Sequence, residues 1–352
     1  MKVASAPDVH LTYCTNIHAG ESWAELRANL LRHVVAVKRR VAPEERFGVG
    51  LRVSAAAAEE LAEPAAREEL RRILAENDLY VFTINGFPYG SFHRTRVKEA
   101  VYRPDWLEAS RARYSESLAR LLSALLPDGV DGSVSTVPVA YAPRMRGVLD
   151  DERAAGALVE HAAFLRRLHD TTGRTIGLAL EPEPACRLET SEDAAAFFEQ
   201  SVFRREHVAR YASLTGLAGS VAEESLRRHL GVCLDTCHAA VEFEDTEWSI
   251  ARLGAAGIRI LKIQLSAGLS LRALTPERLA ALRPFADDVY LHQVVARHGD
   301  ETSRFLDLPE AFARARVGDD TEWRVHFHVP LFLAELGPFR STQEVVAGVL
   351  DR

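Results

Sequence analysis

The stretch Gly231-Val-Cys-Leu-Asp-Thr-Cys-His238 decides the fold that this sequence predicts. An apolar run containing β-branched Val232 ends in the acid Asp235, and His238 follows three residues later. Such a run is typical of a buried parallel strand that delivers polar side chains at its carboxyl end. A carboxylate and an imidazole placed in this way can share a divalent metal ion or a sugar hydroxyl.

Two cysteines flank this acid, among four in the 352-residue chain. Four cysteines in a chain of this length do not make a disulfide scaffold. We interpret Cys233 and Cys237 as small apolar side chains, because free cysteine is among the most buried residue types. A zinc cluster of Cys233, Cys237 and His238 is the sharper alternative, although zinc sites usually draw on paired ligands at other spacings.

Six further segments repeat the pattern of an apolar strand followed by a helix. The seven expected strands are residues 9–16, 47–53, 79–85, 133–139, 175–181, 231–235 and 258–265. Seven such units in succession predict a parallel sheet covered by helices. Both a doubly wound sheet and a (β/α)8 barrel are built in this way.

Polar residues at the strand ends favour the barrel. They are Asn16, Arg52, Asn85, Glu181, Asp235 and Gln264. A site fed by many strands around a ring is typical of an α/β TIM barrel, whereas a switch-point crevice draws on a few strands. The first strand–helix turn also lacks a G-x-G-x-x-G motif, and the chain contains no Walker motif.

The C-terminal region departs from this alternation of strands and helices. Residues 289–297 and 323–332 both have the pattern of strands, and a short helix over 308–317 lies between them. We expect a single barrel domain over residues 1–352, with an inserted strand pair at about 285–332. Either the segment 323–332 closes the barrel as its eighth strand, or the eighth strand is missing.

The overall composition is that of a globular chain with a sizeable core. The chain is 47% hydrophobic, and 43 basic against 50 acidic residues give a net charge of -7, which disfavours nucleic acid as a partner. No apolar run is long enough for a membrane span, and the N-terminus has no signal-peptide core. We expect a cytoplasmic protein, and a homo-oligomer or pathway partners stay open.

The candidate site gathers side chains from the strand ends and from the C-terminal strand. We expect the metal ligands to be Glu181, Asp235, Gln264, His326 and His328. The two histidines share one face of a strand by period two, about 7 Å apart, although an ordinary half-buried alternation would give the same pattern. A lesser alternative for His238 is that it merely caps the next helix.

Two carboxylates on neighbouring barrel strands can act in two ways. They can bind one divalent ion that polarises a carbonyl or a pair of hydroxyls, or they can work directly as acid and base. The metal hypothesis also accounts for the histidine and amide neighbours. We expect catalysis from Glu181, Asp235 and His238. We expect substrate binding from Asn16, Arg52, Asn85 and Lys262.

The motif Leu180-Glu-Pro-Glu-Pro184, followed by Cys233-Leu-Asp-Thr-Cys-His238, resembles the xylose-isomerase-like barrel superfamily. That superfamily includes sugar isomerases, ketose 3-epimerases, inosose dehydratases and endonuclease IV. The resemblance implies a divalent metal (Zn, Mn, Mg or Co) held by the acids at the ends of strands five and six. In the superfamily a histidine of strand seven and a glutamate of strand eight complete the site. Here Gln264 replaces the histidine, and Glu335 lies in a loop-like context.

Other stretches resemble a narrower family, the EboE proteins. They include Leu11-Thr-Tyr-Cys-Thr-Asn-Ile-His18, Tyr80-Val-Phe-Thr-Ile-Asn-Gly-Phe-Pro-Tyr-Gly90 and Val325-His-Phe-His-Val-Pro330. These are barrel proteins of a bacterial gene cluster associated with metabolite traffic. The resemblance implies a role in such traffic or in biosynthesis.

Three functions follow from these patterns. The leading hypothesis is a metal-dependent isomerase or epimerase that acts on a polyol, a sugar or a cyclitol. The second is a phosphodiesterase like endonuclease IV, which would need further histidines at the ends of strands two and three, where this chain has Arg52 and Asn85. The third is a metabolite-binding or trafficking barrel without catalysis, which the replacement at Gln264 favours.

Overall fold

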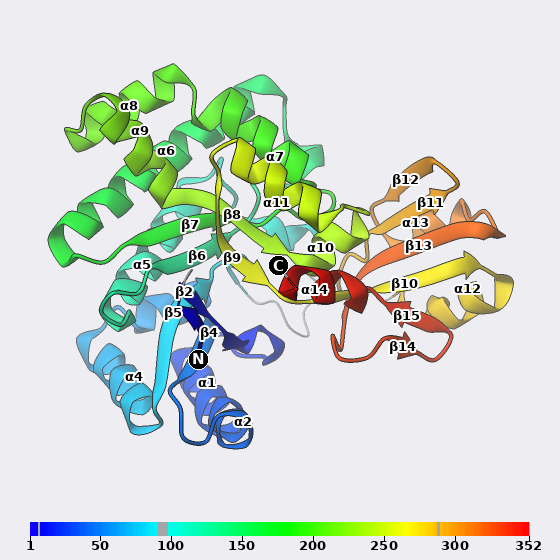
Figure 1. Ribbon diagram of the computed structural model, residues 1–352, viewed down its shortest axis with the longest axis horizontal. Helices are drawn as coiled ribbons and strands as arrows, with labels where there is room; N and C mark the ends of the chain where they lie inside the picture. Colours follow the sequence, from blue (N-terminus) through cyan, green and yellow to red (C-terminus); the bar gives the residue numbers. More distant parts are fainter. Residues whose placement is uncertain (6–7, 91–97, 287–288, 352) are drawn as a thin grey trace.

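The computed structural model describes residues 1–5, 8–90, 98–286 and 289–351, and it arranges them around two large sheets (Figure 1). One sheet has seven strands in the order β3-β4-β5-β6-β7-β8-β9, and all its neighbouring strands are parallel. The other has six antiparallel strands in the order β12-β11-β13-β10-β15-β14. A short hairpin of β1 (Lys2–Ser5) and β2 (Asp8–His10) precedes them.

The parallel sheet confirms the predicted succession of seven strands. They are β3 (Thr12–Cys14), β4 (Phe47–Arg52), β5 (Leu79–Asn85), β6 (Gly132–Thr136), β7 (Ile176–Leu180), β8 (Leu230–Asp235) and β9 (Arg259–Gln264). Their spatial order follows the chain without reversal, as in a barrel, whereas a doubly wound sheet reverses at a switch point. The chain is an α/β barrel of the TIM type. In the part that the structure describes, β9 is not paired with β3, so the barrel is open there.

Helices flank this sheet, most of them on its outer face. They are α1 (Trp23–Asn29), α2 (Val35–Val41), α3 (Ala55–Glu60), α4 (Pro64–Glu76), α5 (Ala109–Leu125), α6 (Val148–Thr172), α7 (Ser191–Phe197), α8 (Arg205–Thr215), α9 (Gly219–His229), α10 (Thr236–Val241) and α11 (Thr246–Ala255). A capping box of Ser22 and Glu25 begins α1. Ser54 caps α3, and Pro64 starts a separate helix, α4, at its first position. No helix within the described ranges is long and apolar enough to cross a bilayer.

One apolar cluster fills the space between the parallel sheet and its helices. It includes fully buried Val81 of β5, Leu122 of α5, Leu158 of α6, Val232 of β8 and Leu253 of α11. Each such side chain contributes about 1.5–3 kcal/mol on burial. The continuous apolar strands are therefore explained by burial on both faces of the sheet.

A β-bulge in β9 sets which of its side chains enter the barrel. The register pairs Val232 with Ile260 and then Cys233 with Lys262, so Leu261 is the extra residue. Leu261 lies over Gly231, where a Cβ would meet its side chain at 2.9 Å. The next residue, Lys262, also points into the barrel, since its Nζ donates to Ser135 Oγ of β6 at 3.1 Å.

The antiparallel sheet is larger than the predicted strand pair. Its strands are β10 (Ala267–Leu274), β11 (Val294–His298), β12 (Glu301–Phe305), β13 (Gly318–Val329), β14 (Glu335–Leu336) and β15 (Phe339–Ser341), and it is flanked by α12 (Pro276–Leu282), α13 (Leu308–Ala313) and α14 (Gln343–Leu350). Of the two alternatives for the eighth strand, closure by 323–332 is wrong, because most of that segment belongs to β13, which pairs with β10 and β11. The parallel sheet ends at β9 in the described residues, as the alternative of a missing eighth strand expected. The antiparallel sheet also starts before residue 285, and residues 287–288 lie outside the described residues.

The antiparallel sheet is anchored at the carboxyl end of the barrel (Figure 1). β10 begins three residues after β9 ends, and α10 and α14 pack between the two sheets. β13 runs antiparallel to β10 and pairs its last residue, Val329, with Ala267. The end of β13 therefore lies beside the ends of the parallel strands, where the predicted site residues are.

Close packing of β8 against β9 generates a testable contrast between two glycines. A Cβ at Gly231 would lie 2.2 Å from the backbone oxygen of Arg259, whereas a Cβ at Gly254 of α11 would meet nothing within 4 Å. We expect Gly231→Ala to lower the free energy of unfolding by about 1–3 kcal/mol. Gly254→Ala should raise it by about 0.5–1 kcal/mol through helix propensity. Urea denaturation measures both, and equal stabilities of the two variants would contradict this packing.

Candidate metal centre at the carboxyl end of the barrel

Several hydrogen bonds fix the Asp235 side chain at the end of β8. It ends β8 and is the N-cap of α10, where its Oδ1 accepts from the backbone N–H groups of Cys237 (2.7 Å) and His238 (3.2 Å). The hydroxyl of Ser266 donates to the same oxygen at 2.5 Å. Burial would raise the pKa of Asp235, but the nearby His238 and His328 and the hydrogen bonds outweigh burial and lower it. Asp235 is thus held as a carboxylate with Oδ2 facing the barrel mouth.

Glu181 and Asp235 converge on the side chain of Gln264. The Gln264 Nε2 donates to Asp235 Oδ2 at 2.5 Å and to Glu181 Oε1 at 3.3 Å. Both carboxylates are buried, with residue exposures of 3% and 2%. Within the described residues, Glu181 Oε2 and Gln264 Oε1 are buried without a hydrogen-bond partner of regular geometry. The NH2 group of Gln264 therefore lies between the two acids. Glu181 Oε2 and Gln264 Oε1 beside it are left with lone pairs that could bind a cation.

Lys262 places a positive charge inside the barrel beside Glu181 and Asp235. Burial would lower its pKa, but Cys233, Glu181 and Asp235 outweigh burial and raise it, so the ammonium is kept. Burial raises the pKa of Glu181, and repulsion from Asp235 adds to this, while Lys262 opposes both. The two acids of the site therefore differ in pKa. Asp235 stays ionised to lower pH, and Glu181 exchanges a proton more readily.

His238 is oriented by a backbone carbonyl. Its Nδ1 lies 2.8 Å from the oxygen of Pro182, and a carbonyl can only accept, so Nδ1 carries the proton. The other ring nitrogen, Nε2, lies 3.9 Å from Asp235 Oδ2. Burial would lower the pKa of His238, but Asp235, Glu183 and Glu181 outweigh burial and raise it. Metal-binding histidines are held in this way, with the second ring nitrogen bonded to an outer acceptor.

The histidines predicted on β13 reach the same place. One ligand atom from each of Asp235, His238 and His328 lies within 4.8 Å of the other two, as metal binding requires. The His326 ring lies 4.6 Å from that of His238, between centroids. The donor set of the site thus combines carboxylate, amide and imidazole groups, which suits zinc, manganese or cobalt.

The predicted substrate-binding residues fall in two places. Lys262 lies inside the barrel, as described above. Arg52 makes a two-pronged ion pair with Glu21 at 2.9 and 3.0 Å, and it also donates to two backbone carbonyls. Asn85 Oδ1 accepts from the backbone N–H group of Phe87, two residues after β5 ends. Asn16 lies in the turn after β3. A role in substrate binding stays a prediction for these three.

A chain of polar side chains beside the site was not predicted. The Tyr102 hydroxyl donates to Glu183 Oε1 at 3.0 Å and accepts from Gln293 Nε2 at 2.7 Å, and Gln293 Oε1 lies 2.8 Å from Nδ1 of His326. Burial raises the pKa of Glu183 to about 7. A charged residue between two prolines was a usable signal for Glu183. No sequence signal pointed to Tyr102 and Gln293, because the two residues are 191 positions apart in the chain.

Comparison with known proteins found similarity to solved structures only. The sequence matches no protein-family model and no curated protein. Similar solved structures include the IOLI protein with a binding zinc atom, at 15% identity over 71% of this chain and 70% of that one, with a TM-score of 0.41. A xylose isomerase domain protein from Planctomyces limnophilus has 12% identity over 66% and 68%, with a TM-score of 0.41. A D-tagatose 3-epimerase-like protein has 11% identity over 67% and 73%, with a TM-score of 0.40.

Two of these similar structures are named for xylose isomerase and D-tagatose 3-epimerase. Identities of 11–15% and TM-scores of 0.40–0.41 carry nothing about the reaction. The function is therefore inferred from the site itself.

Metal binding at Asp235 can be tested against a matched helix cap. Asp245 is the N-cap of α11 as Asp235 is of α10, but it lies away from the site. We expect Asp235→Asn to weaken manganese binding by more than about 100-fold, since even outer partners of a metal ligand are worth 10–100-fold. Asp245→Asn should leave binding unchanged. Isothermal titration after chelator treatment measures both, and equal affinities would exclude Asp235 as a ligand.

Proposed function

We propose that this chain is a divalent-metal-dependent isomerase or epimerase that acts on a small polyol, sugar or cyclitol. The convergence of Glu181 and Asp235 on one amide group of Gln264 supports this most strongly. Two buried carboxylates around one point attract a cation, and the unpartnered oxygens nearby offer it further ligands.

The metal would be held by side chains that already face one another. Asp235 Oδ2, Glu181 and Gln264 would supply oxygen, since a half-turn of the Gln264 amide exchanges its nitrogen for its oxygen. His238 or His328 would supply nitrogen from the opposite side. When bound, a divalent ion polarises a carbonyl and holds two neighbouring substrate oxygens.

Glu181 is the group we assign to proton transfer. It is buried, its pKa is raised by burial, and its Oε2 is unpartnered within the described residues. A carboxylate of this kind can take the proton from the carbon beside a carbonyl and return it. Return to the other face of the same carbon gives an epimer, and return to the neighbouring carbon gives an isomer. Either reaction only redistributes protons and needs no oxidant.

Lys262 and His238 would position the substrate in this scheme. The Lys262 ammonium is fixed by Ser135 inside the barrel and attracts the negative charge that develops as the proton leaves. His238 presents its Nε2 at the mouth, where a hydroxyl can donate to it. An association with metabolite traffic, as in the EboE proteins, stays a prediction.

Exchange of substrate hydrogen with solvent tests the proposed reaction. The metal-loaded protein is incubated with ketoses and inososes in deuterated water, and incorporation beside the carbonyl is followed by NMR. We expect Glu181→Gln to lower the exchange rate by about 10²–10⁴, the usual contribution of a general base. Glu189→Gln is the control, because Glu189 follows the same strand but accepts from Ala185 N–H outside the site. No exchange on any substrate by the wild type would contradict the proposal.

A binding barrel without catalysis is the second candidate. It is favoured by Gln264, which places an amide between the acids where the superfamily resemblance implies a histidine ligand. In that case Asp235→Ala would leave metabolite binding intact, whereas metal-dependent catalysis requires a loss. The phosphodiesterase alternative finds no support at the ends of β4 and β5, because Arg52 and Asn85 are engaged by neighbouring groups.

A further inference from the structure

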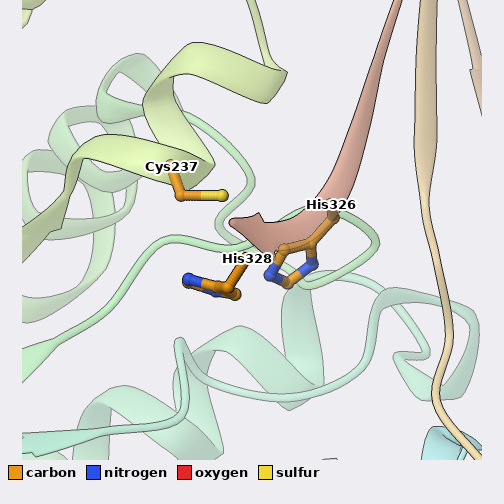
Figure 2. Close-up of side chains that lie close together, drawn as sticks. All are labelled: Cys237, His326 and His328. Atoms are coloured by element: carbon orange, nitrogen blue, oxygen red, sulfur yellow. The ribbon is translucent and has the colours of Figure 1, made fainter. Parts of the chain in front are cut away.

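We propose that Cys237, His326 and His328 form a second, thiolate-containing metal position that takes zinc. One ligand atom of each lies within 4.8 Å of the other two. In Figure 2 the Cys237 side chain extends from α10 on one side, and the two imidazoles extend from the end of β13 on the other. This position does not depend on the reaction proposed above, and the superfamily resemblance does not imply it.

The fold leaves space for the Cys237 sulfur. A Cβ at Gly268 of β10 would lie 3.1 Å from Cys237 Sγ and 3.3 Å from Val241 Cγ2, so an alanine there would press on the thiol. The backbone of Cys237 is fixed, since its N–H donates to Asp235 Oδ1 at 2.7 Å and to Ser266 Oγ at 3.1 Å. The thiol is therefore held in one place on the first turn of α10.

The polar chain beside the site sets the tautomer of His326. Gln293 Nε2 donates to the Tyr102 hydroxyl at 2.7 Å and to the Pro184 carbonyl at 3.2 Å, and these contacts turn its Oε1 toward the ring. Oε1 can only accept, so His326 Nδ1, 2.8 Å away, carries the proton. Nε2 keeps its lone pair, which is the arrangement that outer hydrogen bonds impose on zinc-binding histidines.

His328 links this position to the oxygen-rich one. No hydrogen bond of its ring is found in the described part of the chain, and it belongs to both candidate ligand groups. It is exposed, whereas Cys237 is fully buried and His326 is half-buried, so an ion reaches the group from the solvent side. Because the two groups share one side chain, filling one position changes affinity at the other.

The donor chemistry separates the two positions. A thiolate and two imidazoles are soft to borderline donors that select zinc, whereas carboxylate and amide oxygens also accept magnesium. Binding converts the Cys237 S–H bond into a sulfur–zinc bond and releases one proton to solvent. The contrary interpretation is that Cys237 only fills space beside Val241 and Val295. That interpretation does not account for the two imidazoles that face it.

Cobalt(II) is the probe that distinguishes these interpretations, because a thiolate bound to it gives a strong near-ultraviolet charge-transfer absorption that oxygen and nitrogen ligands do not give. The full chain is freed of metal and titrated with cobalt. We expect this absorption in the wild type, its loss in Cys237→Ser and a weakening of cobalt binding by at least about tenfold in His326→Gln. Cys186→Ser is the matched control, since Cys186 is equally buried, and it should keep the absorption.

Each outcome decides the proposal. Cobalt binding without the thiolate absorption in the wild type, or absorption that survives in Cys237→Ser, would overturn it. Circular dichroism of each variant verifies folding, and His326→Gln provides an independent arm if Cys237→Ser does not fold. Failure here is distinct from failure of the proposed reaction. The thiolate absorption can be missing while Glu181-dependent exchange persists, and it can be present while no substrate exchanges.

Discussion

Burial of the Asp235 carboxylate is the constraint on which the rest of the site depends. An ionised group in the interior is costly unless donors surround it, and here the first turn of α10, Ser266 and Gln264 all donate to it. Those donors come from the ends of β8 and β9 and from the chain that leads into β10. Charge compensation at one residue therefore fixes the junction between the two sheets.

That junction gives the antiparallel sheet a function in the site. β13 begins far from the barrel and ends beside it, so its last residues add imidazole groups at the mouth. The barrel itself is open between β9 and β3 in the described residues and contributes no ligand from an eighth strand. The imidazoles of β13 thus reach the mouth of the barrel from outside the parallel sheet.

Outer hydrogen bonds decide what these imidazoles can do. Pro182 orients the His238 ring so that its Nε2 lies toward Asp235, and Gln293 fixes the proton of His326 on Nδ1, which leaves Nε2 of His326 with its lone pair. Neither contact is local in the chain, because the partners lie 56 and 33 positions away. The same side chains without these partners would be free to adopt either tautomer, and a metal would have to impose the order itself.

The sequence by itself determined the parallel sheet and the meeting of Glu181 with Asp235. Apolar runs that end in acids require burial, and the carboxyl ends of neighbouring parallel strands meet at one edge. It did not determine that Lys262 points into the barrel. Side chains of a strand normally alternate between the two faces, and the bulge at Leu261 shifts that alternation by one residue. Nor did the sequence bring Cys237 together with His326 and His328, because the zinc alternative it offered joined Cys237 to Cys233 and His238. It also did not detect β10, although Leu269 and Leu271 alternate with polar residues. Only the tertiary structure placed β13 against the barrel, since long-range pairing depends on packing that local patterns do not encode.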